Sequence, residues 1–278
     1  RIMVFSGIVE EMGTVEAMRE VDAMTLWDGS VGSGWVLTVR ASIVNDAESC
    51  YIGASIAVNG TCLTVTRFVA GVDFDVGISP ETLRCTNLGA LASGEKINLE
   101  RSLPASARNS GHFVQGHVDA TGTILRKWRE GDSLWIRIAL PPRLLAYVVP
   151  KGYIAVDGTS LTVCDVKNES YTAKAGDDTD DSGPWFTVML IQHTQQCIIM
   201  PHKEDGAAVN LEVDVLSKYA ERASLRLESR LAEHERRLAV IEGSTPTGLS
   251  SFQSVGYGVA FAAGVLATAL VLLRRREK

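Results

Sequence analysis

IAVNGTCLTV, residues 56–65, recurs as IAVDGTSLTV at residues 154–163 with eight of its ten positions identical, and this repeat predicts the architecture. Other segments recur in the same order. GIVEEMGTV at residues 7–15 matches GHVDATGTI at residues 116–124, and INLE from Ile97 matches VNLE from Val209. Blocks that repeat in one order indicate two copies of one structural unit. Single matches extend the repeat, with Phe74, Val76, Thr82 and Cys85 paired to Phe186, Val188, Thr194 and Cys197.

Each copy has the composition of a small β-barrel. Short segments rich in Val, Ile and Thr alternate with Asn-Gly, Asp-Gly and other glycine signals, which predicts strands and tight turns. Five or six strands per copy favour closure, because a closed barrel leaves no exposed strand edge. We therefore expect a mainly β protein with two tandem six-stranded closed barrels, residues 3–111 and 112–214. The predicted strands of the first copy are residues 35–39, 56–58, 63–66, 74–78 and 97–100.

Two insertions distinguish the copies. In the first copy we expect an extra loop around residues 28–35, where DGSVGSG, residues 28–34, has the composition of a turn. In the second copy AGDDTDDSGP, residues 175–184, predicts a solvated hairpin tip.

The C-terminal part has a different composition. Residues 215–242 carry charges of both signs without Pro or Gly, which predicts a long helix. Apolar residues at a spacing of three and four form one face of this helix, here called the seam. The seam packs either on a partner or on copies of itself, or it packs on the chain's own barrel, and the sequence leaves both possibilities open. After a linker, residues 243–254, the segment 255–273 is almost wholly apolar and predicts a single transmembrane helix before the basic tail 274–278. The seam residues are Ala220, Ala223, Leu227, Leu231, His234, Leu238 and Ile241.

Composition excludes several classes of protein. The 278 residues include 46% hydrophobic and 22% charged residues, as in ordinary folded proteins. The net charge of -6 argues against nucleic-acid binding, which usually needs a basic surface. The five cysteines are odd in number and lack a C-x-x-C pair, so they indicate neither a disulfide framework nor a zinc cluster.

The repeated motifs resemble riboflavin synthase of the two-barrel type. The resemblance rests on MVFSGIVEEMGTV, GASIAVNGTCLTVT, ETLRCTNLG, GHFVQGHVD and KGYIAVDGTSLTV, while MLIQHTQ from Met189 is similar to the eukaryotic, fungal branch. It implies a dismutation in which two 6,7-dimethyl-8-ribityllumazine molecules exchange a four-carbon unit, giving riboflavin and 5-amino-6-ribitylaminouracil. It further implies a homotrimer and no metal or redox cofactor.

The resemblance also implies the site residues. In the first barrel we expect catalytic roles for Phe5, which would pack on the ligand ring, and for Ser55, Cys62 and His117, with substrate contacts from Thr64, Thr82 and His112. A histidine that titrates near neutral pH suits proton removal from a lumazine methyl group. In the second barrel we expect substrate contacts from Lys151, Ser160, Thr162, Ile191, Thr194 and Asp214.

Simpler interpretations exist for several of these residues. Cys62 fits a small buried hydrophobe, Thr64 and Thr162 fit strand propensity, and Asp214 fits a helix N-cap. An alternative function is a catalytically silent lumazine- or flavin-binding subunit of a membrane complex. The span predicts membrane anchoring with the barrels facing the cytosol or an organelle matrix, and a mitochondrial location stays open.

Overall fold

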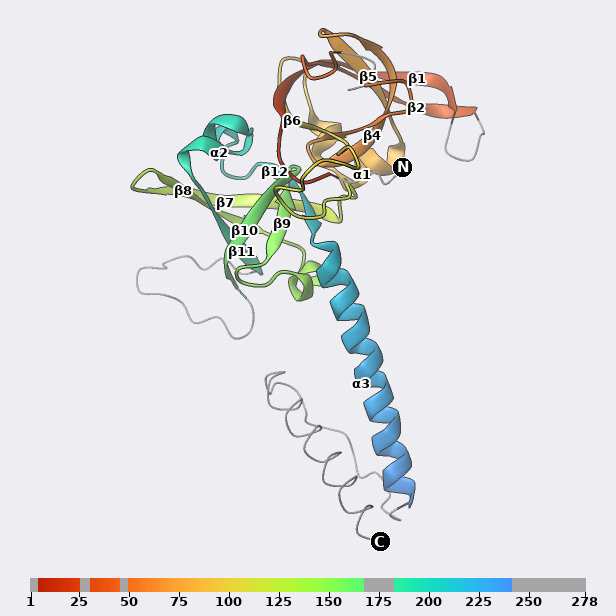
Figure 1. Cartoon of the computed structure of the whole chain (residues 1–278), viewed down its shortest axis with the longest axis vertical. Coiled ribbons are helices and arrows are strands. Elements are labelled where there is room, and N and C mark those ends of the chain that lie inside the picture. Colours follow the sequence, from red (N-terminus) through yellow and green to blue (C-terminus); the bar gives the residue numbers. More distant parts are fainter. Residues whose placement is uncertain (1–4, 26–30, 46–49, 168–182, 242–278) are drawn as a thin grey trace. The chain divides into compact units, whose positions relative to one another are not determined.

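The computed structural model describes residues 5–25, 31–45, 50–167 and 183–241, and it contains two closed antiparallel barrels of six strands (Figure 1). The first barrel has the ring order β1-β2-β5-β4-β3-β6, and the second has the equivalent order β7-β8-β11-β10-β9-β12. The predicted pair of six-stranded barrels is therefore confirmed.

The strands of the first barrel are β1 (Glu11–Thr25), β2 (Val31–Arg40), β3 (Ser55–Val58), β4 (Thr61–Val69), β5 (Asp73–Ile78) and β6 (Lys96–Arg101), with the short helices α1 (Pro80–Cys85) and η1 (Asn87–Ala90) between β5 and β6. The second barrel has β7 (Ala120–Glu130), β8 (Ser133–Ala139), β9 (Tyr153–Val156), β10 (Thr159–Val166), β11 (Trp185–Leu190) and β12 (Ala208–Val213), with the helices η2 (Pro142–Tyr147), α2 (Gln192–Cys197) and η3 (Met200–His202).

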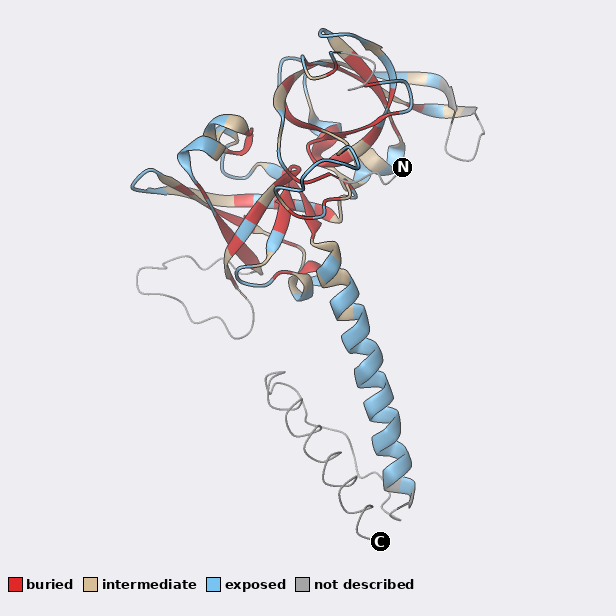
Figure 2. Cartoon of the chain, viewed as in Figure 1, coloured by how far each residue is buried: buried red, intermediate tan, exposed pale blue. Residues whose placement is uncertain are grey.

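Alternation along the strands builds the two cores. In β4, Leu63 and Val65 are buried while Thr64 between them is exposed, and β10 repeats this pattern with Leu161, Thr162 and Val163. Successive side chains of a strand point to opposite faces, so the apolar residues fill the barrel interior. Figure 2 shows the buried residues concentrated in both barrels.

The loop predicted at residues 28–35 is wrong in part. Val31 to Gly34 belong to β2 and pair with β1, with Gly34 opposite Val21 and Gly32 opposite Met24. Backbone hydrogen bonds hold this ribbon, and glycine supplies them as well as any residue, so a turn-like composition did not prevent strand pairing. Residues 26–30 and most of the predicted tip at residues 175–184 lie outside the described residues.

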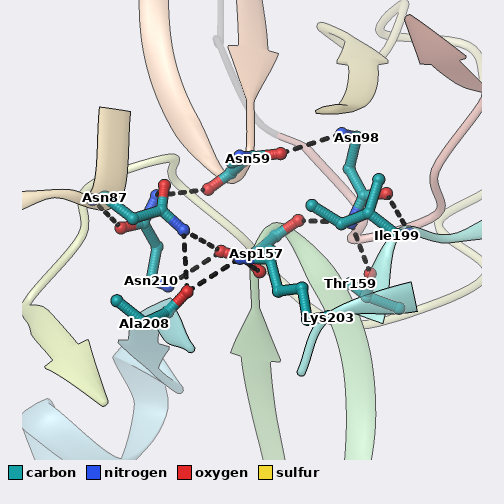
Figure 3. A network of polar contacts seen from close by, with 9 residues as sticks. All are labelled: Asn59, Asn87, Asn98, Asp157, Thr159, Ile199, Lys203, Ala208 and Asn210. Carbon is teal, nitrogen blue, oxygen red and sulfur yellow. Dashed lines mark hydrogen bonds and ion pairs between the residues drawn. The ribbon is translucent and has the colours of Figure 1, made fainter. Parts of the chain in front are cut away.

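The barrels meet at the tips of equivalent hairpins (Figure 3). Asn59 lies in the turn between β3 and β4, and Asp157 lies in the turn between β9 and β10. Asn98 Nδ2 donates to the carbonyl of Asp157 at 2.9 Å, and Asn210 Nδ2 donates to the carbonyl of Asn59 at 2.8 Å. A Cβ on Gly60, the next residue of the first turn, would lie 2.5 Å from backbone of the facing turn. Only glycine permits this approach.

One of these turns carries a buried charge. Asp157 is fully buried, and its Oδ2 lies 2.7 Å from Lys203 Nζ. Its Oδ1 accepts hydrogen bonds from Asn87 Nδ2 and from the backbone N–H of Asn210, both at 2.8 Å. A buried carboxylate persists when it is paired and hydrogen-bonded in this way.

The helix α3 (Val215–Ile241) confirms the predicted long helix. Leu227, Leu231 and Leu238 of its predicted seam are exposed by 54%, 60% and 56%. The predicted span, residues 255–273, lies outside the described residues. The helices that the structure does describe include none long and apolar enough to cross a bilayer.

Candidate functional sites

The hairpin β3–β4 carries the first group of predicted residues. Ser55 faces Thr64 and Ala57 faces Cys62 across the ladder. Ser55 is buried, Cys62 is partly buried and Thr64 is exposed. Burial raises the pKa of the Cys62 thiol, a hydrogen bond with Ser55 opposes this rise, and the charge of Glu212 adds to it. The raised pKa disfavours the thiolate of Cys62, which is the nucleophilic form.

A segment that leads into the second barrel completes this first site. The backbone N–H of Cys62 donates to the carbonyl of Gly116 at 2.8 Å, and the next residue, His117, is exposed. The backbone N–H of His117 donates to Glu212 Oε2 at 2.9 Å. The structure thus brings His117 to the hairpin of Cys62, although the two residues belong to different copies of the repeat.

The N-terminal segment does the same for the second barrel. The backbone N–H of Ser160 donates to the carbonyl of Gly7 at 2.8 Å, which is the counterpart of the Cys62–Gly116 bond. The segments that lead into the barrels, residues 5–7 for the first and residues 112–117 for the second, are called the leading segments. They pair with each other at Phe5 and Val114, with N–H to O distances of 2.8 and 3.1 Å. Each barrel therefore receives part of its site from the segment that leads into the other.

Phe5 does not form a platform for a ligand in this structure. Its side chain is fully buried and packs with Val114, Ala57 and Ala155 in a small core between the barrels, which Cys62 borders. The sequence predicted that this ring packs on a ligand, whereas in the structure it packs in the protein interior. Pairing with Val114 turns the ring inward, and nothing in the sequence MVFSG reveals that pairing.

The histidine pair is separated. His112 was expected beside His117 in the first barrel, but its Nδ1 lies 2.7 Å from Ser160 Oγ in the second. Its ring stacks on Tyr153 with centroids 5.2 Å apart and planes at 7°. Burial lowers the pKa of His112, with Asp214 acting in the opposite direction. The segment 112–117 runs along the junction, so its two ends reach different hairpins.

The second hairpin, β9–β10, presents Lys151 and Thr162 at its surface. Both side chains are exposed, and Thr162 faces Tyr153 across the ladder. Lys151 has a φ of 65°, in the left-handed region where the equivalent residue of the first barrel, Gly53, has a φ of 89°. A lysine in this conformation is strained, and such strain often marks functional positions.

The remaining predicted residues lie in helices or directly before them. Thr82 in α1 is half-buried, and its Oγ1 lies 3.0 Å from Ser79 Oγ. At the equivalent positions of the second barrel, Ile191 precedes α2 with 56% of its surface exposed, and Thr194 is half-buried. Asp214 accepts a hydrogen bond from the backbone N–H of Leu216 at 3.0 Å, which confirms the helix N-cap interpretation.

Sequence reasoning missed Glu100, Glu212 and Tyr153. The glutamates are the last letters of the matched blocks INLE and VNLE, and both are buried. A glutamate kept at the same position in both copies of the repeat was the signal that could have found them. Tyr153 gave no such signal, because its counterpart in the first copy is Ser55.

Comparison with known proteins agrees with the duplicated fold. A model of the lumazine binding domain matches residues 6–102 and again residues 115–214. The fold also resembles LumP complexed with riboflavin, with a TM-score of 0.59 at 21% identity over 75% of this chain and 98% of that chain. LumP complexed with 6,7-dimethyl-8-(1'-D-ribityl) lumazine gives a TM-score of 0.57 at 22% identity with the same coverage. At this identity the likeness concerns the fold alone.

Relatives with higher identity are enzymes. Riboflavin synthase of Schizosaccharomyces pombe is 42% identical over 221 residues, which are 78% of this chain and 92% of the relative. The enzyme of Saccharomyces cerevisiae is 40% identical over 84% of this chain and 92% of its own length, and that of Bacillus subtilis is 38% identical over 77% and 87%. Because both barrels match the lumazine binding domain and these relatives align over most of their length, the chain belongs to the riboflavin synthase family.

Proposed function

We propose that this chain catalyses the riboflavin synthase dismutation on two different sites, one at each hairpin. Two molecules of 6,7-dimethyl-8-ribityllumazine react, and one gives a four-carbon unit to the other. The products are riboflavin and 5-amino-6-ribitylaminouracil, so atoms and electrons balance without an oxidant or reductant. The observation that carries this proposal is the pair of equivalent hairpins, each completed by the segment leading into the other barrel.

The first site supplies groups for proton transfer. His117 is exposed beside the hairpin, and a histidine can remove a proton from an acidified methyl group near neutral pH. Cys62 remains protonated and can return a proton. Ser55 supports the thiol by a hydrogen bond, and we assign contacts to the heterocycle to Thr64, which is exposed, and to the half-buried Thr82.

The second site is better suited to hold its substrate by hydrogen bonds. Ser160 and His112 form a polar pair 2.7 Å apart. Lowering of the pKa of His112 by burial keeps this imidazole neutral at pH 7, so it can both donate and accept. The exposed groups of Lys151 and Thr162, with Asp214 at the start of α3, are suited to the polar ribityl chain.

The reaction needs the two kinds of site face to face, and we propose that copies of the chain supply this arrangement as a homotrimer. The exposed leucines of α3, Leu227, Leu231 and Leu238, form the apolar seam that would join the copies. Sedimentation of the full chain tests this proposal. The double variant Leu227→Glu, Leu231→Glu should be monomeric and less active per chain. An unchanged trimer would show that these leucines do not join the copies.

The decisive test of function is direct. The full chain is incubated with 6,7-dimethyl-8-ribityllumazine, and riboflavin is measured by its fluorescence with a 1:1 yield of the uracil product. Continuous formation of both products supports the enzyme. Tight binding of the lumazine without product would instead support the silent lumazine-binding subunit of a membrane complex.

We further propose that residues 255–273 anchor the chain to a membrane. This uncharged stretch of 19 residues is long enough for the roughly 30 Å hydrocarbon layer and is followed by RRREK. The full chain should then sediment with membranes and need detergent for release, while the barrels face the cytosol or an organelle matrix. Recovery of the full chain in the supernatant without detergent would contradict the anchor.

A further inference from the structure

Two glutamates occupy equivalent positions on the strands that close the barrels. Glu100 lies on β6 and Glu212 on β12, and only 5% and 3% of their surfaces are exposed. A carboxylate in such a place costs free energy unless donors surround it. Neither residue is among the groups assigned above to the substrate, so their burial in both copies needs another explanation.

Their hydrogen bonds supply this explanation. Glu212 Oε1 accepts from the backbone N–H of Gln115 at 2.7 Å, and Oε2 accepts from the backbone N–H of His117 at 2.9 Å. Glu100 Oε1 accepts from the backbone N–H and hydroxyl of Ser6 at 2.6 and 2.8 Å, and Oε2 accepts from the backbone N–H of Gly7 at 2.9 Å. Each carboxylate therefore grips two residues of one leading segment.

The gripped segments are those that cross to the opposite hairpin. Gly116 lies between the two amides held by Glu212, and its carbonyl accepts the N–H of Cys62. A Cβ at Gly116 would lie 2.6 Å from Cys62 Cβ, and one at Gly7 would lie 2.6 Å from Ser160 Cβ. At such close packing, a small shift of the segment moves the reactive side chains of the hairpin.

From this geometry we propose that Glu212 and Glu100 are positioning residues, each fixing the leading segment of its own barrel so that this segment completes the site of the other barrel. Glu212 thereby sets the position of His117 against Cys62, and Glu100 sets the N-terminal segment against Ser160. The activity readout of this proposal rests on the proposed function.

Electrostatics connects Glu212 to the first site. Burial raises the pKa of Glu212 to about 7, against the hydrogen bonds from Gln115 and His117. The other charged groups that act on it are Lys218, which lowers the pKa, and Asp119, which raises it. In return, Glu212 raises the pKa of Cys62. The reactivity of this one thiol therefore reports on the carboxylate.

Glu100 has a matching environment at the second site. Burial raises the pKa of Glu100 to about 7, against the hydrogen bonds from Ser6 and Gly7, and Glu10 raises it further. No cysteine lies at the equivalent of Cys62, where Ser160 stands. Glu100 is thus a matched control for the thiol readout.

The test uses Glu212→Gln, Glu100→Gln and the exposed control Glu130→Gln in the full chain. Glutamine keeps the volume but replaces one acceptor oxygen by an NH2 donor, which then faces a backbone N–H. We measure kcat and KM for the lumazine, and the rate at which iodoacetamide alkylates Cys62 at pH 7, followed by peptide mass spectrometry. Cys50, which is 2% exposed in the same barrel, reports on unfolding.

We expect Glu212→Gln and Glu100→Gln each to lower kcat at least tenfold, while Glu130→Gln stays within twofold of the parent. Alkylation of Cys62 should rise severalfold in Glu212→Gln alone, with Cys50 unchanged. The proposal is overturned if kcat of both variants is near that of the parent, or if Cys62 responds equally to both substitutions.

If Glu212→Gln does not fold, Glu212→Asp decides. The shorter side chain keeps the charge but cannot reach both amides, so kcat should fall with the circular dichroism unchanged, and an unaltered kcat with unaltered Cys62 alkylation overturns the proposal. An inactive parent chain would refute the proposed function instead, and the alkylation contrast would still test the positioning role.

Discussion

The two barrels share their hydrogen bonds to backbone groups and differ in several side chains around the hairpins. Asn98 and Asn210 make the same hydrogen bonds to the facing turn, and Glu100 and Glu212 grip the same part of the leading segments. Around the hairpins and the segments that reach them, the copies differ at several equivalent positions, with Cys62 against Ser160, Ile8 against His117, Gly53 against Lys151, Ser55 against Tyr153 and Ser102 against Asp214.

This division suits a reaction between two identical molecules. Repeated backbone contacts produce two cradles of one shape, so both can accept the same ligand. Different side chains then give the bound molecules different environments, which is what a donor and an acceptor require. The following substitutions change one copy at a time and use the equivalent residue of the other copy as a reference where one exists.

The largest effect is expected at His117. Removal of a group that transfers protons usually lowers rates by about 10² to 10⁴, so His117→Ala should lower kcat at least a hundredfold. Because the His117 side chain is exposed, the variant should keep its fold, and circular dichroism checks this. Ile8→Ala, at the equivalent position, should leave kcat within about threefold. Similar losses of kcat in both variants would contradict the proposed role of His117 in proton transfer.

The pH dependence of stability should come next in size. Glu100 and Glu212 have pKa values of about 7 in the folded chain, raised from 4.5 chiefly by burial. The folded state therefore holds protons that the unfolded state has released, and the free energy of unfolding falls as pH rises from about 4.5 to 7. Each carboxyl contributes a slope of at most about 1.4 kcal/mol per pH unit.

Urea unfolding of the full chain at several pH values measures this slope. The double variant Glu100→Gln, Glu212→Gln replaces both titrating carboxyls, so its free energy of unfolding should depend less on pH than that of the parent. Identical slopes for parent and double variant would show that these carboxyls do not titrate in this range.

The buried charge at the hairpin tips gives the next prediction. Asp157→Asn leaves the Lys203 ammonium without its ion-pair partner and should lower the free energy of unfolding by about 1–3 kcal/mol. Adding Lys203→Met should restore part of this loss, because the unpaired charge is then gone. A double variant that is less stable than Asp157→Asn would mean that the lysine stem contributes more by packing than by its charge.

The smallest effect is expected at Lys151. Its φ of 65° is unfavourable for a side chain with a Cβ, so Lys151→Gly should raise the free energy of unfolding by about 1 kcal/mol while raising KM for the lumazine. The reciprocal variant Gly53→Lys should be destabilised by a similar amount. Greater stability with unchanged KM would show that the Lys151 side chain takes no part in binding the lumazine.

Most elements of the fold could be predicted from local sequence patterns. The repeat indicated two units, and segments rich in Val, Ile and Thr with an Asn-Gly turn between them placed the predicted strands 56–58, 63–66 and 74–78 within β3, β4 and β5. These signals are local, since strand propensity and turn chemistry act between neighbouring residues. The helix after Asp214 followed from composition for the same reason.

The grouping of residues around each hairpin became visible only in three dimensions. His112 and His117 are close in sequence, but His112 reaches Ser160 of the second hairpin, while Gly116, beside His117, bonds to Cys62 of the first copy. Burial of Phe5 and the gripping of the leading segments by Glu100 and Glu212 likewise depend on how the barrels dock. Docking depends on contacts between residues far apart in the chain, which local patterns do not encode.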